Sequence, residues 1–299
     1  MSSPFQVIDP HVHYWSLKEN NQPWLADPQP NLLGDYSPMA HDHLPENLEQ
    51  ASDGIEVLAT VHVEADATDP IAETRWLSDL MEKEERLAPS ALVVGVDLSQ
   101  DDAEAVLDEH MSLSTHVRGV RQILNVHANP LFDYVGRHYM RERLWKGHFA
   151  LLADRNLSFD LQIYPSQMAE AATLARQHAD TQFVLNHAGM YVDRMTLAGW
   201  QEWRDGLHLL GHCPNVSIKL SGFGMLDHHW TPGSIRPLIW EAIDVFGVER
   251  ALFASNFPVD GLYASYTQLW QAYADIVSGV SEHEFARLFR DNARSLYRL

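Results

Sequence analysis

The chain has 299 residues and a formal charge of −20, from 41 acidic and 21 basic residues. A surface with this excess of negative charge repels nucleic acid and anionic membranes, so neither is expected as a partner. Hydrophobic residues make up 45% of the chain, and no apolar run reaches the roughly 18 residues of a membrane span, which indicates a globular protein. The N-terminus lacks the pattern of a signal peptide and Cys213 is the only cysteine, so we expect a cytoplasmic protein without disulfides.

The first predicted strand, 7–11, leads into two histidines separated by one residue, His11 and His13. Alternate side chains of a strand point to the same face, so the two imidazoles are expected to converge on one small volume. An isolated pair of this kind is more often an ordinary pair in a loop. The rest of the chain favours the functional interpretation.

Short β-branched segments alternate with helical patterns along the whole chain. Eight strands are predicted, at 7–11, 57–64, 92–97, 117–124, 158–163, 183–187, 216–220 and 252–256. Apolar residues spaced three and four apart predict helices at 71–87, 102–113, 140–155, 167–178 and 235–246, and Ser281 with Glu284 forms a capping box for a last helix. This alternation predicts an α/β protein, a single (β/α)8 barrel that spans 1–299 as one domain.

A long irregular stretch, 14–47, follows the first strand and carries five prolines together with Trp15, Trp24 and Tyr36. In a barrel it would lie over the face where the strands end. Its aromatic residues are expected either to form part of the wall of a pocket or only to cover the top of the barrel.

Polar side chains stand at the carboxyl ends of seven of the eight predicted strands. In a parallel barrel these ends meet around one site, and burying so many polar groups is costly unless they are paired or functional. The set comprises His11, His13, Glu64, Arg121, Gln122, Asp160, Gln162, His187, Lys219, Ser221, Asn256 and Asp260. Each one taken alone is explained by a structural role.

The chain resembles the amidohydrolase superfamily, and within it the amidohydrolase-related branch that includes sugar-acid lactonases and pyrone-dicarboxylate lactonases. The motifs are Ile-Asp-Pro-His-Val-His, Gly-Val-Arg-Gln, Leu-Asn-His-Ala-Gly, Ile-Lys-Leu-Ser-Gly and Phe-Ala-Ser-Asn-Phe-Pro-Val. The resemblance implies a metal on the first-strand histidines and a later histidine, and an aspartate base on the eighth strand. This chain keeps His11, His13 and His187, but it has Gln162 and Asn256 where a histidine and the aspartate are expected, and an amide is no base.

Two catalytic hypotheses follow. In the first, the protein is a lactonase, a hydrolase acting on an ester bond, that needs no cofactor. Arg121 and Lys219 bind the substrate, aided by Trp15 and Trp24, while His11, His13 and Gln162 polarise the ring carbonyl, and His187, Glu64 or Asp260 activates a water that Asn256 orients. In the second, His11, His13 and His187, with a carboxylate such as Glu64, hold one Zn²⁺ for hydrolysis or decarboxylation.

A third hypothesis is a ligand-binding barrel without activity, because Asn256 replaces the expected base. In all three cases the expected partner is a small acidic or polyhydroxylated molecule. The sequence leaves open whether the chain forms a homo-oligomer.

Overall fold

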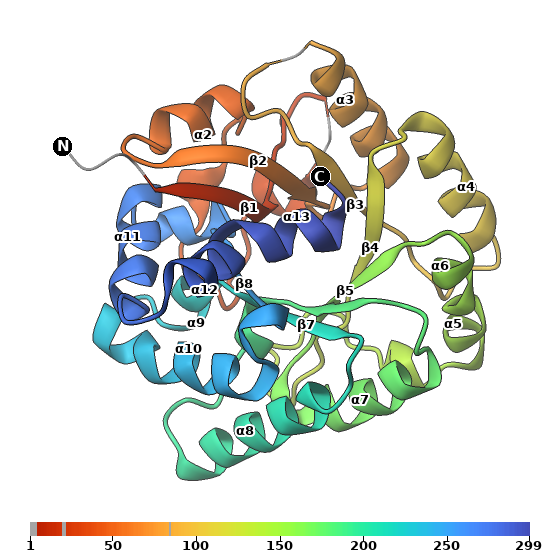
Figure 1. Cartoon of the computed structure of the whole chain (residues 1–299). Helices are drawn as coiled ribbons and strands as arrows, with labels where there is room; N and C mark the ends of the chain where they lie inside the picture. The colour runs from red at the N-terminus through yellow and green to blue at the C-terminus, as the bar shows by residue number, and fades with distance from the viewer. Residues whose placement is uncertain (1–4, 20–21, 84) are drawn as a thin grey trace.

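The computed structural model describes residues 5–19, 22–83 and 85–299. Its core is one sheet of eight parallel strands in which each strand pairs with the next along the chain, as predicted. Figure 1 shows the helices around the outside of these strands. The strands are β1 (Gln6–Val12), β2 (Glu56–Val63), β3 (Ala91–Gly95), β4 (Val117–Ile123), β5 (Ser158–Gln162), β6 (Phe183–Leu185), β7 (Val216–Leu220) and β8 (Ala251–Phe253).

The barrel closes between β1 and the segment that follows β8. The backbone N–H of Asn256 donates to the His11 carbonyl at 2.8 Å, and the N–H of His13 donates to the Phe257 carbonyl at 2.8 Å. The buried Asp9 carboxylate ties the same seam, because it accepts hydrogen bonds from the Ser255 N–H at 3.0 Å and the Tyr266 hydroxyl at 3.0 Å. Both first-strand histidines are therefore fixed by the closure of the sheet.

Amphipathic helices form the outer layer and bury their apolar faces against the strands. The longer ones are α3 (Pro70–Glu82), α4 (Ala103–Leu113), α7 (Met168–Gln177), α8 (Leu197–Gly211), α10 (Pro232–Phe246) and α11 (Tyr266–Ile276). The shorter helical segments include α2 (Pro45–Ala51), α5 (Arg143–His148), α6 (Ala150–Asp154) and α9 (Phe223–Leu226). No helix among the described residues combines the length and apolarity of a membrane span.

The helical prediction needs three corrections. The predicted helix 140–155 is divided into η2 (Tyr139–Arg141), α5 and α6, with Phe149 buried at the junction of the last two. Helix α3 ends at Glu82 rather than at 87, where Leu87 has a positive φ of 65°. Helices α8 and α11 were not predicted, although Thr196 and Ser265 cap their N-termini through side-chain hydrogen bonds.

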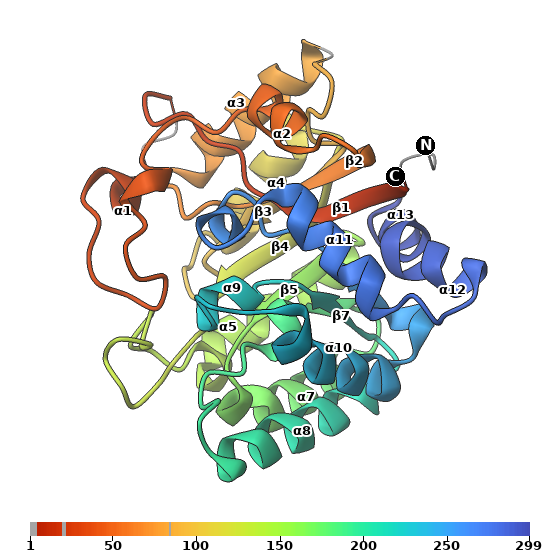
Figure 2. The same ribbon diagram turned by 90° about the vertical axis from the view of Figure 1, so that its left-hand side faces the viewer.

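The two ends of the barrel have different coverings (Figure 2). The chain ends in α12 (Glu282–Ala286), the π-helical turn η7 (Arg287–Asp291) and α13 (Asn292–Tyr297). Of these, η7 and α13 contact β1 and β8 at the end where the strands begin. The loop after β1, with α1 (Pro23–Ala26) and η1 (Ser37–Met39), lies at the opposite end. This loop forms a second apolar cluster apart from the barrel core, with Trp15, Leu25, Leu33, Tyr36 and Met39 buried in it.

Candidate active site

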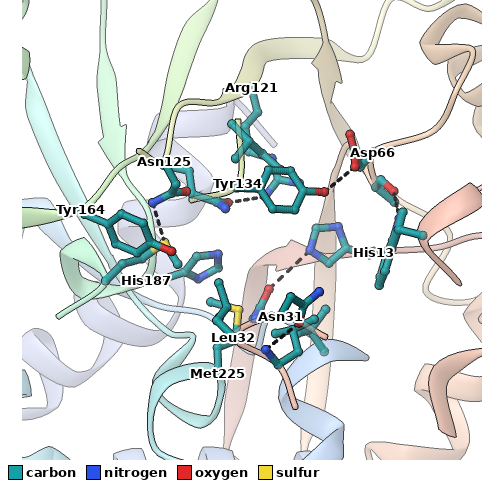
Figure 3. A pocket seen from close by; sticks show the side chains of 18 of the residues that line it. His13, Asn31, Leu32, Asp66, Arg121, Asn125, Tyr134, Tyr164, His187 and Met225 are labelled. Atoms are coloured by element: carbon teal, nitrogen blue, oxygen red, sulfur yellow. Dashed lines mark hydrogen bonds between the residues drawn. The ribbon is translucent and has the colours of Figure 1, made fainter. Parts of the chain in front are cut away.

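A pocket opens at the carboxyl ends of the strands, between the barrel and the loop after β1 (Figure 3). The space between its walls, including the part open to solvent, is about 770 Å³. Its polar lining residues are His13, Asn31, Asp66, Arg121, Asn125, Tyr134, Gln162, Tyr164, His187 and Asn256. The predicted wall residues Trp15 and Trp24 line it too, so the loop both covers the barrel and encloses the pocket.

Three of the predicted histidines converge below this pocket. The ring of His11 lies 5.0 Å from that of His13 and 4.6 Å from that of His187, measured between centroids. Burial lowers the pKa of each imidazole well below 6.5, and the nearby charges of Lys219 or Arg121 lower it further. All three are therefore neutral at pH 7, and only His13 and His187 reach the pocket surface.

The tautomer of His13 follows from its contact with the backbone. Its Nδ1 lies 2.7 Å from the carbonyl oxygen of Val63, which can only accept a hydrogen bond. The ring proton is therefore on Nδ1, and Nε2 presents a lone pair. Nε2 lies 3.4 Å from Asn256 Oδ1, and the Asn256 amide also contacts the Asp260 carboxyl group.

His187 and Asn256 follow strands that end earlier than predicted, at Leu185 and Phe253. Both have a left-handed backbone, with φ of 54° and 58°, which turns their side chains toward the barrel axis. His187 Nδ1 lies 3.1 Å from the Ser221 hydroxyl. The residue after Ser221 must be glycine, because a Cβ on Gly222, whose φ is 69°, would lie 2.6 Å from the His187 side chain.

Arg121 joins β2, β4 and β5 at the floor of the pocket. Its Nε donates to Glu64 Oε1 at 2.5 Å, and its terminal nitrogens donate to the Glu64 carbonyl at 2.5 Å and to Gln162 Oε1 at 2.9 Å. Glu64 Oε2 accepts the N–H of Asp66 at 2.8 Å. The Glu64 carboxylate is therefore committed to these partners and does not line the pocket, whereas the Gln162 amide N–H₂ is left to face it.

Lys219 lies beneath the histidines inside the barrel and does not line the pocket. It pairs with Asp160, which also accepts hydrogen bonds from Asn186 Nδ2 at 2.9 Å and from the Tyr297 hydroxyl at 3.1 Å. Its ammonium is 3.4 Å from His11 Nδ1. The prediction that Lys219 binds substrate is thus not matched by its position, since a fully buried and paired ammonium cannot reach a substrate.

Asp260, a predicted alternative base, also lies outside the pocket lining. Its side chain is 1% exposed and accepts the backbone N–H of Gly222 at 2.9 Å. Burial raises the pKa of Asp260 to about 7. The carboxyl group therefore holds the turn that carries Ser221 and Gly222 and does not meet the substrate.

Several lining residues were missed because they come from loops without periodicity. Asp66 follows β2, and Asn125 and Tyr134 lie in the segment after β4; Tyr134 donates its hydroxyl hydrogen bond to Asp66 Oδ2 at 2.5 Å. The apolar side of the pocket consists of Leu32, Leu33, Ala65, Ile123, Met190, Met225 and Val259. The Asn and Gly residues of 125–136 mark a loop but give no sign of where its side chains point.

Similarity to known proteins identifies the family of this chain. Residues 8–299 match the family model described as Amidohydrolase. The chain belongs to the amidohydrolase family. It is 40% identical to the uncharacterized protein y4mH of Sinorhizobium fredii, over 99% of this chain and 100% of that protein.

Two more distantly similar proteins have a described activity or structure. An L-fucono-1,5-lactonase of Burkholderia multivorans is 28% identical over 88% of this chain and 85% of its own length. A crystal structure of a Burkholderia multivorans amidohydrolase with bound zinc is 25% identical, with a TM-score of 0.81, over 99% of this chain and 100% of that one.

In this chain, His11 Nε2 is buried without a hydrogen-bond partner, and the contacts of the three histidines limit which ring nitrogens could bind zinc. Within residues 5–19, 22–83 and 85–299, no three His, Cys, Asp or Glu side chains are grouped to hold a metal. The Lys219 ammonium can only donate to His11 Nδ1, so the His11 proton is on Nε2, which removes that nitrogen as a ligand. Glu64 and Asp260 are committed elsewhere, so His13 and His187 are left as the side chains with a ring nitrogen toward the pocket, and the steps below use no metal.

Proposed function

We propose that this protein is a lactonase, which opens a cyclic ester by attack of water at the carboxyl end of the barrel. One observation carries the proposal: His13, with an imidazole lone pair, and Gln162, with an amide N–H₂, both line the same pocket. The family of the chain and its similarity to an L-fucono-1,5-lactonase support the same reaction.

His13 serves as the general base. It is neutral at pH 7, its Nε2 lone pair faces the pocket, and the Val63 carbonyl holds the ring in this tautomer. When Nε2 takes a proton from water, the Nδ1–H bond to the same carbonyl stabilises the resulting imidazolium. This role differs from the predicted one, because a nitrogen without a proton cannot polarise a carbonyl.

Gln162 and Arg121 stabilise the negative charge that develops on the carbonyl oxygen. Arginine can only donate, so its bond to Gln162 Oε1 orients the amide with N–H₂ toward the pocket. Arg121 has two N–H groups that its contacts to Glu64 and Gln162 leave unused. These donors are positioned before the reaction begins, which makes them effective as an oxyanion hole.

The tetrahedral intermediate collapses by breaking the bond between the carbonyl carbon and the ring oxygen. The imidazolium of His13 returns its proton to the departing alkoxide, so the product is a hydroxy acid and the base is regenerated. An ester loses its alkoxide more readily than an amide loses its amine, and the site offers hydrogen bonds and one base. These groups are sufficient for a lactone.

The test is hydrolysis of a panel of five- and six-membered lactones by the purified protein, followed as acid release at constant pH. We expect Gln162→Glu to reduce kcat about a hundredfold, because glutamate still accepts from Arg121 but donates nothing to the oxyanion. Gln201→Glu, an exposed change of the same kind on α8, should leave kcat unchanged. Absence of turnover with every lactone, or full activity in Gln162→Glu, would refute the mechanism.

A further inference from the structure

Two formally charged side chains line the pocket, Arg121 and Asp66. Arg121 is 5% exposed, and its charge is matched by the Glu64 carboxylate at 2.5 Å. Lys219, the other cation of the predicted substrate site, is buried below the pocket against Asp160. The positive charges close to the site are therefore neutralised by carboxylates of the protein itself.

Asp66 differs from Arg121 because nothing balances its charge. Among the ion pairs of residues 5–19, 22–83 and 85–299, none involves Asp66. Figure 3 shows the Tyr134 hydroxyl directed at this carboxylate, at the edge of the pocket near His13. The pocket thus presents a held carboxylate to an entering molecule and no unmatched cation among its described lining residues.

One side of the remaining wall is unsuited to a carboxylate on the substrate. Leu32, Met190, Met225 and Val259 form an apolar side that offers no hydrogen bond to an anion. A substrate carboxylate would lose its hydration shell there and would also be repelled by Asp66. A neutral ring with an apolar face meets neither penalty.

We propose that the pocket accepts uncharged lactones and that Asp66 determines this specificity by excluding lactones that carry a carboxylate. The inference rests on the proposed lactone hydrolysis and chooses between the two substrate classes that the sequence left open. It also assigns Asp66 a part in product release, because hydrolysis turns the neutral substrate into an anion.

The local backbone permits a clean test of the charge. Asp66 has a φ of 54°, a left-handed conformation that asparagine adopts as readily as aspartate. In Asp66→Asn the amide oxygen can still accept the Tyr134 hydroxyl, so the variant removes the charge and keeps the contact. Tyr134→Phe does the reverse, since it removes the contact and keeps the charge.

The experiment compares D-glucono-1,5-lactone with D-glucaro-1,5-lactone, which differ in a hydroxymethyl or a carboxylate group at C6. We expect the wild type to favour the neutral lactone in kcat/KM by at least tenfold, and Asp66→Asn to reduce that preference about tenfold. The preference should weaken in 0.5 M NaCl for the wild type and not for the variant, because salt screens an exposed charge. Tyr134→Phe, and Asp244→Asn on the exposed face of α10, should keep the wild-type preference.

A second measurement separates this inference from the reaction itself. Calorimetric titration with cyclohexanecarboxamide and cyclohexanecarboxylate, which share a shape but cannot be opened as lactones, reports the charge preference without turnover. The role of Asp66 is supported if the wild type binds the amide more tightly than the carboxylate and if this difference in affinity is smaller in Asp66→Asn. This holds even if no lactone is hydrolysed. Equal or tighter binding of the carboxylate, or no binding of the amide, overturns it whatever the lactone assay shows.

Discussion

The carbonyl oxygen of Val63 decides which nitrogen of His13 faces the pocket. A histidine beside a hydroxyl can adopt either tautomer, but a backbone carbonyl accepts only, so the 2.7 Å contact leaves the lone pair on Nε2. Other side chains of the site are also oriented by hydrogen bonds to groups that can only accept or only donate. Arg121 orients Gln162 in the same manner, because a guanidinium only donates.

His13→Ala is expected to reduce lactone turnover at least a hundredfold, since it removes the base. The melting temperature should change little, because His13 lies at the pocket surface and the closure of the barrel uses its backbone rather than its ring. Enzyme kinetics and thermal melting of the purified variant measure both effects, with the exposed His41→Ala as a control. Wild-type turnover in a folded His13→Ala protein would remove His13 from the mechanism.

Asp260 provides a prediction about stability and pH. Its pKa is raised from 3.8 to about 7 by burial, so between these values the folded state binds a proton that the unfolded state has lost. The stability from this proton is fully present below pH 4 and is lost as pH rises through 7. By pH 8 the loss amounts to at most roughly 4 kcal/mol for a shift of this size.

In Asp260→Asn the same position stays neutral at every pH, and the amide oxygen can still accept the Gly222 N–H. We expect the melting temperature of the variant to be close to that of the wild type at pH 5 and to be higher than that of the wild type at pH 8. Melting curves of both proteins at the two pH values test this, with Asp244→Asn as the matched loss of an exposed charge. A difference between variant and wild type that is the same at pH 5 and pH 8 would contradict the assigned role of burial.

At the scale of the elements, the strand ends do more than terminate the sheet. β6 and β8 stop two residues before His187 and three before Asn256, and the left-handed backbone at both positions turns polar side chains inward. The loop after β1 then adds the outer wall. Because its aromatic residues form a cluster separate from the barrel core, this wall can change without unfolding the barrel.

Trp24 tests that separation. Its indole N–H donates to the Ala65 carbonyl at 2.9 Å, and its ring contacts Trp15 and Tyr36. We expect Trp24→Ala to raise KM for a lactone about tenfold with a small change in melting temperature, and Trp24→Phe to have an intermediate effect because it keeps the packing. Steady-state kinetics and thermal melting distinguish this from a core residue, whose loss would lower the melting temperature of the whole protein.

In the molecule as a whole, the helices that close the barrel and the candidate active site lie at opposite ends of the barrel axis. The last helices cover the end where the strands begin, and Tyr297 from α13 reaches Asp160 inside the barrel. The pocket occupies the other end, in agreement with the arrangement of barrel enzymes. Between them lies the Lys219–Asp160 pair, so the ion pair supports the histidines from below.

Removal of metal is expected to leave the activity and stability of the whole protein unchanged. Because the Lys219 ammonium occupies the lone pair of His11 Nδ1, we expect zinc binding to be weak, and dialysis against a chelator should change neither lactone turnover nor melting temperature. Asn256→Asp should raise zinc affinity, because it adds an anionic oxygen beside His13. The test measures metal content, activity and melting temperature before and after dialysis. If the protein holds one zinc per chain and loses both activity and stability when it is removed, the histidines bind metal.

The sequence by itself determined the order of the eight strands, the place of the histidine pair at the first strand and the family, which the fold and the comparisons confirm. These are local or periodic properties, and a pattern of side chains records them directly. It also placed His13, Arg121, Gln162, His187 and Asn256 at strand ends, and the structure brings them to one pocket; their roles in catalysis stay predictions.

Only the tertiary structure decided which polar groups are available to a substrate. Glu64 and Lys219 stand at strand ends like the others, but each is consumed by a partner 57 or 59 residues away. Pairing of this kind depends on distances across the barrel, which side-chain periodicity does not contain. For the same reason Asp66 and Tyr134, which meet from two loops 68 residues apart, became visible only once the strands had placed those loops side by side.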